Sequence, residues 1–419
     1  MIVLQDKQDC CGCSACVQLC PKKCIAMQED EEGFLYPKVD VSLCIDCGLC
    51  EKVCPVINKN ESRVPLNVYA AINPNEEVRL QSSSGGIFTM LAEQIIEEGG
   101  VVFGVGYNEH WEAAHSYTET KEGIAAFRMS KYVQSIVGKT FQQAEVFLKA
   151  GRKVLYSGTP CQIAGLKRYL RKNYVNLLTI DFICHGTPSP GVFRWYLADE
   201  FAKIARKSDK KNIFSLQAIP SIPKADVLAS SCGLEINDIR FRDKKKGWKK
   251  FSLALDLSRV TSEGEKKPVM LLDTLDKNPF LRGFLRDLYL RPSCHECPTK
   301  ELRSGSDITL GDFWGIHNIL PNMDDDKGIS AILLNTARGK EFFNCLNLQK
   351  KYVNFQILCN YNTALLRSSP KLKLRAIFYE QSLNSFFKVI DKLCNIPFNL
   401  RIKRAIKIRL GMLKDMLKK

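Results

Sequence analysis

The sequence predicts an α/β fold with some α+β elements, preceded by a cysteine-rich module and followed by a basic helical tail. Three observations lead to this prediction. Cysteines crowd the first 54 residues, strand-like and helix-like segments alternate between residues 84 and 207, and positive charge gathers after residue 386. Because strands that alternate with helices build a mainly parallel sheet, we expect a mainly parallel α/β domain in the middle of the chain.

The cysteine-rich module repeats the spacing C-x2-C-x2-C-x3-C-P twice. The runs are Cys10, Cys13, Cys16, Cys20 and then Cys44, Cys47, Cys50, Cys54. Bacterial two-cluster ferredoxins have this spacing, and the fourth cysteine of each run ligates the other [4Fe–4S] cube. We therefore expect two clusters, on Cys10, Cys13, Cys16 and Cys54 and on Cys44, Cys47, Cys50 and Cys20. Zinc matches less well, since its sites usually combine two C-x2-C pairs. Cys11 and Cys24 are expected to be spare thiols.

The composition favours a cytoplasmic protein. The first residues show no basic stretch followed by an apolar one, as a signal peptide would. Without an export signal, the 18 cysteines indicate metal or redox use and not a disulfide framework. The net charge of +16 does not indicate nucleic-acid binding, because no known module combines the charge with interleaved aromatic residues.

The length of 419 residues suggests about three domains, and we expect five segments. They are a ferredoxin-like module (1–60), two parts of one α/β domain (66–150 and 151–330), an α/β or helical extension (331–385) and the basic tail (386–419).

The first helix of the α/β domain is expected to have Ser84 as its N-cap and to stop at Gly99-Gly100, with apolar residues at helical spacing between them. A buried strand, VVFGV, follows. A helix that begins beside Gly85 and Gly86 leaves backbone N–H groups free for a phosphate. An ordinary capped surface helix is the alternative.

A second strand–turn–helix unit begins at Val154. Thr159 is expected to cap its helix, and Pro160 suits the first helical turn. The apolar run LLTIDFIC then predicts a strand buried on both faces, and a further helix follows at 191–207. No G-x-G-x-x-G occurs, so a Rossmann dinucleotide site is not supported. Farther on, residues 239–257 predict a hairpin around Lys246-Gly247 with its lysines on a solvated face.

Four more cysteines lie in or beside these units. Cys161 falls in the first turn of a predicted helix, Cys184 ends a predicted strand, and Cys294 and Cys297 form a C-x2-C pair. Adjacent parallel strands end at the same edge of a sheet, so Cys161 and Cys184 are expected to be neighbours. The spacing leaves open a four-thiolate cluster, a zinc site, a catalytic thiol at Cys161, or buried apolar cysteines, and buried cysteines are also the expectation for Cys232, Cys345, Cys359 and Cys394.

Several stretches resemble the beta-subunit family of coenzyme F-420 hydrogenases and dehydrogenases. They are SSSGGIF, SKYVQS, SGTPCQIAGL, ICHGTPSP, FRDKKKGW, the C-x2-C pair and DITLGDFWG, between about Val68 and Gly315. With the ferredoxin-like module, the chain resembles fused bacterial members often associated with exopolysaccharide-synthesis loci. The resemblance implies an FAD-containing iron–sulfur oxidoreductase with a third [4Fe–4S] cluster on Cys161, Cys184, Cys294 and Cys297. It implies an FAD site lined by Ser84, Gly85, Gly86, Lys131, Gln134, Thr159 and Pro160. Lys131 would stabilise a reduced flavin anion there, or else be a plain surface charge.

Three functions stay open on the sequence. The first is an oxidoreductase acting on a small organic substrate, such as a deazaflavin or a sugar intermediate. The second is an electron relay that links ferredoxin to a redox partner protein, for example a glycan-modifying enzyme. The third is a zinc-stabilised scaffold.

The basic tail predicts an amphipathic helix over residues 402–419. Such a helix lies on an anionic membrane surface or packs on its own domain with a solvated basic face. The first case would make the protein peripheral at the inner membrane surface.

Overall fold

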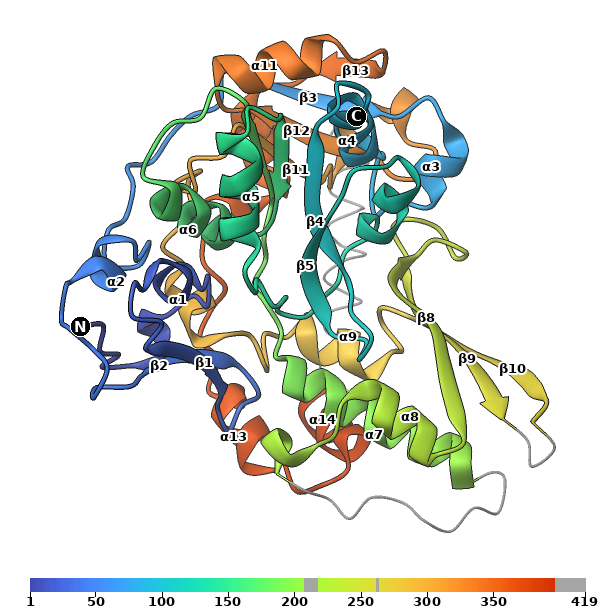
Figure 1. Ribbon diagram of the computed structural model, residues 1–419. Coiled ribbons are helices and arrows are strands. Elements are labelled where there is room, and N and C mark those ends of the chain that lie inside the picture. Colours follow the sequence, from blue (N-terminus) through green and yellow to red (C-terminus); the bar gives the residue numbers. More distant parts are fainter. Residues whose placement is uncertain (207–217, 261–263, 396–419) are drawn as a thin grey trace.

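An eight-stranded sheet forms the centre of the computed structural model, which describes residues 1–206, 218–260 and 264–395 (Figure 1). The strand order is β13-β3-β12-β11-β7-β6-β4-β5. The bounds are β3 Asn67–Ile72, β4 Val101–Tyr107, β5 Ala113–Thr118, β6 Val154–Ser157, β7 Leu177–Phe182, β11 Ile308–Asp312, β12 Ser330–Leu334 and β13 Gln349–Tyr352. The neighbours β4, β6, β7 and β11 are parallel, which confirms the predicted α/β core, while the outer strands pair antiparallel.

Both faces of the central strands are covered by helices. On one face, Val101 and Phe103 of β4 share an apolar cluster with α5 and α6, whereas Val102 belongs to the cluster of α4 and α11 on the other face. The bounds of these helices are α4 Ile87–Glu97, α5 Thr140–Lys149, α6 Pro160–Leu170 and α11 Ala337–Asn344. Burial on both faces explains why these strands are continuous apolar runs in the sequence.

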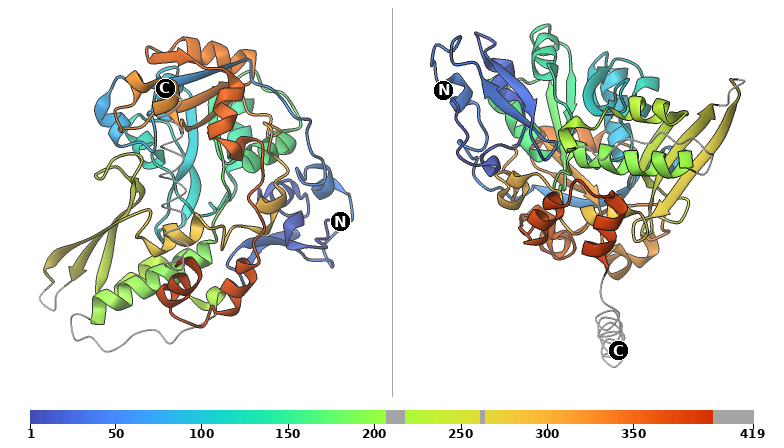
Figure 2. Two further views of the ribbon diagram at one scale, coloured as in Figure 1. Left: turned by 180° about the vertical axis from the view of Figure 1, so that it is seen from behind. Right: turned by 90° about the horizontal axis from the view of Figure 1, so that it is seen from below.

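A three-stranded antiparallel sheet, β10-β9-β8, projects on the side away from the ferredoxin-like module (Figures 1 and 2). Its strands are β8 Leu234–Asp243, β9 Ser252–Val260 and β10 Lys266–Thr274. The β8–β9 pair confirms the predicted hairpin around Lys246-Gly247. A separate apolar core joins this sheet to α7 Pro190–Arg206, α8 Ala225–Ser231, α9 Pro279–Phe284, α13 Leu374–Glu380 and α14 Phe386–Cys394. The remaining α-helices of the described residues outside the module are α3 Glu76–Leu80, α10 Ile316–Ile319 and α12 Phe355–Tyr361.

The ferredoxin-like module packs directly against the α/β domain. Its elements are α1 Ala15–Leu19, β1 Ile25–Glu29, β2 Leu35–Val39 and α2 Leu49–Lys52. The two backbones nearly touch at Gly33, where an added Cβ would lie 2.5 Å from the Cα of Gly191. Ion pairs join Glu29 to Arg194 and Glu32 to Arg375 across the same junction. The module is therefore held by close backbone packing and by partly buried charge pairs.

One expected helix begins later than predicted, and another falls outside the described residues. Helix α4 does not have Ser84 as its N-cap: it begins at Ile87, and Gly86 is the N-cap with a φ of +80°. The Ser84 hydroxyl instead donates to the Ile329 carbonyl at 2.7 Å. The predicted helix over 402–419 lies outside the described residues. In the described part of the chain, no helix has the length and apolar character needed to cross a membrane.

The close packing at Gly191 yields a testable prediction. In Gly191→Ala, the new Cβ would lie 2.4 Å from the Cγ2 of Ile219 and 2.7 Å from the Cα of Gly33. Overpacking of this kind costs about 1–3 kcal/mol, so the denaturation midpoint of the anaerobic full chain should fall. Gly106→Ala is the matched control, because its Cβ would meet its nearest atom at 3.6 Å. Equal midpoints for the two variants would contradict the packing described here.

Candidate functional site

The parallel strands end at a cavity of about 500 Å³, which we call the sheet-edge cavity. Four strand ends contribute lining residues, namely Val105 of β4, Ser157 of β6, Phe182 of β7 and Asp312 of β11. Parallel α/β sheets bind ligands at this edge, and sites for small molecules usually have volumes of about 300–1,000 Å³. The cavity is therefore large enough for a cofactor.

Helix α4 begins at the wall of the sheet-edge cavity. Gly86 and the first-turn residues Ile87 and Phe88 line the cavity, and Gly86 has no side chain that would cover the first N–H groups of α4. Free N–H groups at a helix start favour an anion. Gly85 does not line the cavity, because its Cα faces β3 and β12: an added Cβ would lie 2.5 Å from the Ala71 oxygen. Because Gly85 has no side chain, the loop can pack tightly against the sheet.

A partly buried lysine from the β8–β9 hairpin holds this loop. The Lys244 ammonium donates to the carbonyls of Arg79, Ser84 and Lys327 at 2.8, 2.9 and 2.7 Å. Burial lowers the pKa of Lys244 to about 7, while three carbonyl acceptors favour its charged form. The expectation of a solvated lysine face is therefore wrong for Lys244, because this side chain turns inward.

Arg242, from the same hairpin, lines the sheet-edge cavity. Its guanidinium contacts Asp312 at 2.6 Å and donates to the Tyr132 hydroxyl and to the Ser83 carbonyl. It also lies over the Phe251 ring at 4.1 Å. Arg242 thus fixes three segments around the cavity and brings a positive charge to its wall.

The other expected FAD residues divide between two cavities. Thr159 and Gln134 line the sheet-edge cavity, whereas Pro160 lines a neighbouring cavity. At the start of α6, the Thr159 N–H is already used within the helix, because it donates to the Gln162 side chain at 2.9 Å. Gln134 accepts a hydrogen bond from Arg291 at 2.8 Å.

Lys131 lines the sheet-edge cavity, but its ammonium is engaged elsewhere. It donates to the carbonyls of Ala126, Arg128 and Met129 at 2.9, 2.7 and 3.4 Å. Burial lowers the pKa of Lys131 to about 7. Because these three acceptors use the ammonium hydrogens, Lys131 is neither a plain surface charge nor a free donor to the cavity. In this structure it fixes the loop between residues 126 and 131.

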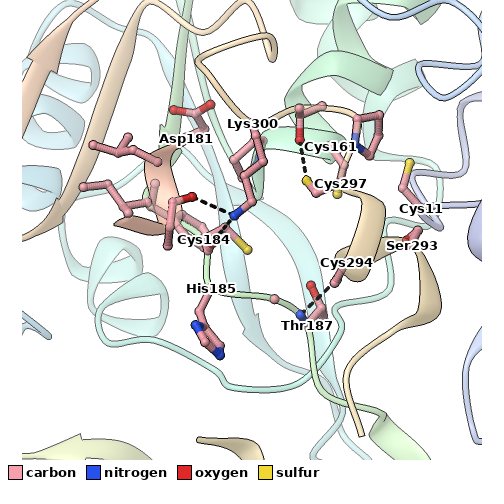
Figure 3. Close-up of a pocket in the computed structure, with 18 of the residues that line it drawn as sticks. Cys11, Cys161, Asp181, Cys184, His185, Thr187, Ser293, Cys294, Cys297 and Lys300 are labelled. Carbon is pink, nitrogen blue, oxygen red and sulfur yellow. Dashed lines mark hydrogen bonds between the residues drawn. The ribbon is translucent and has the colours of Figure 1, made fainter. Parts of the chain in front are cut away.

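The second group of cysteines lines one space beside the sheet-edge cavity, which we call the inner cysteine cavity (Figure 3). Its thiols come from Cys161, Cys184, Cys294, Cys297 and also Cys11. The Cys294 sulfur accepts the Thr187 N–H at 3.3 Å, and the Cys184 carbonyl accepts from Lys300 at 2.7 Å. Burial raises the pKa of Cys294 to about 12 and also raises that of Cys184.

The eight cysteines of the repeated spacing line two further cavities. Cys10, Cys13, Cys16 and Cys54 line the first, which we call the proximal cysteine cavity. Cys20, Cys44, Cys47 and Cys50 line the second, the distal cysteine cavity. Each cavity thus combines three cysteines of one run with the fourth of the other. Across residues 1–206, 218–260 and 264–395, no three His, Cys, Asp or Glu side chains are grouped closely enough to hold one metal ion.

Two cysteines of the module lie outside the repeated spacing, and both line these cavities. Cys11 lines the proximal, inner and sheet-edge cavities, so it stands where all three meet. The Cys24 sulfur lies 3.4 Å from that of Cys20 and lines the distal cavity. Sequence reasoning missed both positions, as it missed Arg242 and Lys244, because spacing alone does not reveal contacts between distant segments.

Family comparisons match most of the chain. Residues 151–356 match the C-terminal domain model of the coenzyme F420 hydrogenase/dehydrogenase beta subunit, and residues 68–141 match the N-terminal one. Residues 9–58 match a 4Fe-4S dicluster domain.

Individual relatives give a similar picture. One subunit of the F(420)H(2) dehydrogenase of Methanosarcina mazei is 28% identical over 42% of this chain and 53% of its own length. Coenzyme F420-dependent sulfite reductase of Methanocaldococcus jannaschii is 25% identical over 84% of this chain and 48% of its own length. The chain thus spans about half the length of these curated relatives. A solved structure of the F420-reducing [NiFe] hydrogenase complex from Methanosarcina barkeri contains a chain that matches 79% of this one and is itself covered to 93%, with 16% identity and a TM-score of 0.41.

These matches place a 4Fe-4S dicluster domain ahead of two consecutive domains of one family. The chain belongs to the coenzyme F420 hydrogenase/dehydrogenase beta-subunit family.

Proposed function

We propose that the chain is an iron–sulfur flavoprotein oxidoreductase that passes electrons between three [4Fe–4S] clusters and FAD. The observation that carries the proposal is the series of cavities that leads from the distal to the proximal to the inner cysteine cavity and then to the sheet-edge cavity. The lining of each of the first three includes the four cysteines expected for one cluster. Cys24 also lines the distal cavity, and Cys11 also lines the proximal and inner cavities. Bound FAD would exchange electron pairs with a substrate, and the clusters would carry single electrons.

The contacts between cavities support this order. Ile2 lines the proximal cavity, and its N–H donates to the Cys50 sulfur of the distal set at 3.3 Å. Cys11 then lines both the proximal and the inner cavities, and Cys161 and Cys184 line both the inner and the sheet-edge cavities. The distal cavity shares no lining residue with the sheet-edge cavity in the described part of the chain. Cys47 is exposed there, which suits exchange with a redox partner protein.

The sheet-edge cavity has the chemistry that FAD needs. The α4 start would hold the pyrophosphate through backbone N–H groups, and the ion pair of Arg242 with Asp312 lies on the same wall. Aromatic residues Phe251, Phe284 and Trp314 line the same cavity and offer apolar area to rings. Of the expected site residues, Ser84, Gly86, Lys131, Gln134 and Thr159 line this cavity.

For the substrate, we propose a small organic two-electron carrier of the deazaflavin type. This choice is supported by the names of the relatives, two of which act with coenzyme F420. A relay without its own substrate is the competing function, and the exposed position of Cys47 suits either one. Neither relative's name supports a role in polysaccharide synthesis.

The cluster assignment predicts a selective loss of iron. The anaerobic full chain should contain about twelve iron atoms by four per cluster. In Cys294→Ser, about four should be lost, since one of four ligands of the inner cluster is removed. Cys359→Ser is the control, because Cys359 lines none of these cavities and is buried in the apolar cluster around Trp248 and Phe313. Iron and acid-labile sulfide analysis decides: equal iron in the two variants, or zinc in place of iron, rules the assignment out.

The flavin site predicts a selective loss of FAD. Lys244→Met removes the donor that holds the Ser84 carbonyl and should loosen the loop before α4. FAD content should therefore fall several-fold, while iron content stays at the wild-type value. Lys245→Met, at the exposed neighbouring position, is the matched control. If Lys244→Met retains full FAD, the pyrophosphate does not bind at this loop.

The substrate proposal predicts a result that distinguishes an oxidoreductase with its own substrate from an electron relay. Anaerobic mixing of the full chain with reduced coenzyme F420 should oxidise the deazaflavin and bleach the cluster absorption in the same sample. Reduction of the clusters by dithionite but not by reduced coenzyme F420 or another small hydride donor would favour the relay.

A further inference from the structure

Arg291 is a fully buried cation at the junction of the ferredoxin-like module and the α/β domain. Only 1% of its surface is exposed. Its Nε donates to the Cys10 carbonyl at 2.8 Å, and Nη2 donates to the Leu35 carbonyl at 3.0 Å. Nη1 donates to Gln134, which lines the sheet-edge cavity. One side chain therefore touches the loop of the first cysteine run and the wall of the sheet-edge cavity.

The charge of Arg291 has no carboxylate partner within ion-pair distance among the described residues. Other buried arginines do have one, since Arg194 pairs with Glu29 and Arg242 with Asp312. Around Arg291 there are instead aromatic rings, with Tyr36 at 4.1 Å and Phe34 at 5.4 Å. A buried charge is costly unless it is paired, so a counter-charge is expected close by.

A cysteine sulfur close to the guanidinium can supply that counter-charge. Nη2 of Arg291 lies 3.5 Å from the Cys10 sulfur, which lines the proximal cysteine cavity. Arg291 is also close to the inner cavity, because it lines that cavity and its carbonyl accepts the N–H of Cys294 at 2.8 Å. Gly12, with a φ of +72°, leaves room for this approach: an added Cβ would lie 3.1 Å from the guanidinium carbon.

We propose that Arg291 is a positioning residue that sets the reduction potential of the cluster on Cys10, Cys13, Cys16 and Cys54. A reduced cluster carries one more negative charge than the oxidised one, so a fixed cation and a hydrogen bond to its sulfur favour the reduced form. Arg291 thus makes this cluster a better electron acceptor than it would otherwise be. The inference rests on the proposed function, since it requires a cluster at this site.

The Arg291 charge lies near the proximal cluster site, and this position affects the direction of electron flow. Arg291 does not line the distal cysteine cavity, and neither do Cys10, Leu35 and Gln134, the residues to which its guanidinium donates. Arg291 therefore raises the reduction potential of the proximal cluster relative to that of the distal cluster. Electrons that enter at the distal cluster are drawn toward the α/β domain.

The test compares potentials in the anaerobic full chain. Arg291→Gln keeps a hydrogen-bond donor and removes the charge, Arg291→Lys keeps the charge, and Arg194→Gln removes a charge of similar burial at the same junction. Redox titrations followed by electron paramagnetic resonance give the midpoint potentials. The couple lost in a Cys16→Ser variant identifies the proximal cluster.

In Arg291→Gln, iron content should match the wild type, while the proximal couple shifts to a more negative potential. We expect at least a tenfold change in its reduction equilibrium, which is about 59 mV for a one-electron couple. In Arg291→Lys, which keeps the charge, the potential of the proximal couple should stay close to the wild-type value. Arg194→Gln should leave this potential unchanged.

Other results overturn the inference. Unchanged potentials in Arg291→Gln with full iron would do so, and so would equal shifts in the glutamine and lysine variants. Loss of about four iron atoms from both, by the four-per-cube count, would make Arg291 a purely structural residue. These outcomes leave the proposed function standing. A wild-type chain without iron–sulfur clusters would instead overturn both.

Discussion

The contact between helix α6 and the ferredoxin-like module is the constraint on which the proposed electron path depends. Gly165 of α6 packs so closely on Cys13 that an added Cβ would lie 2.8 Å from the Cys13 Cβ and 2.9 Å from its sulfur. Cys161 precedes Gly165 by four residues, so both lie on one face of α6. The same helix face therefore carries a cysteine of the inner cavity and the surface that receives the module. A larger residue at 165 would push the two sets of cysteines apart.

Three buried or partly buried cations arrange the loops around this path. Lys244 and Lys131 each gather three backbone carbonyls, and Arg242 joins the end of β11 to the loop before α4. A loop fixed in this way keeps its N–H groups in place before a ligand arrives, so less conformational entropy is lost on binding. Lys131 and Lys244 thus help to maintain the shape of the sheet-edge cavity, although the sequence alone suggests that they are ordinary charged surface residues.

The packing of the module also explains why its two ends differ. Ion pairs from Glu29 and Glu32 and the Gly33–Gly191 contact hold the side that carries the proximal cavity. None of Glu29, Glu32 and Gly33 lines the distal cavity. Cys47 is exposed there, and the apolar Leu43 and Ile45 near it in the sequence are exposed too. The tight side suits electron transfer within the chain, and the open side suits an encounter with another protein.

The sequence by itself determined what depends on local spacing. The doubled cysteine runs predicted a dicluster module, and the alternation of strands and helices predicted the parallel core, because both patterns arise from neighbours along the chain. Contacts across long separations could not be predicted in this way. Ser84 was expected to cap a helix but bonds to Ile329, and Lys244 was expected in solvent but holds the loop of Ser84. Only the tertiary structure placed Cys11 where three cavities meet and Arg291 beside Cys10, since 281 residues separate the latter pair. Spacing determines which residues one turn or loop brings together, whereas the packing of domains decides which buried charge faces which sulfur.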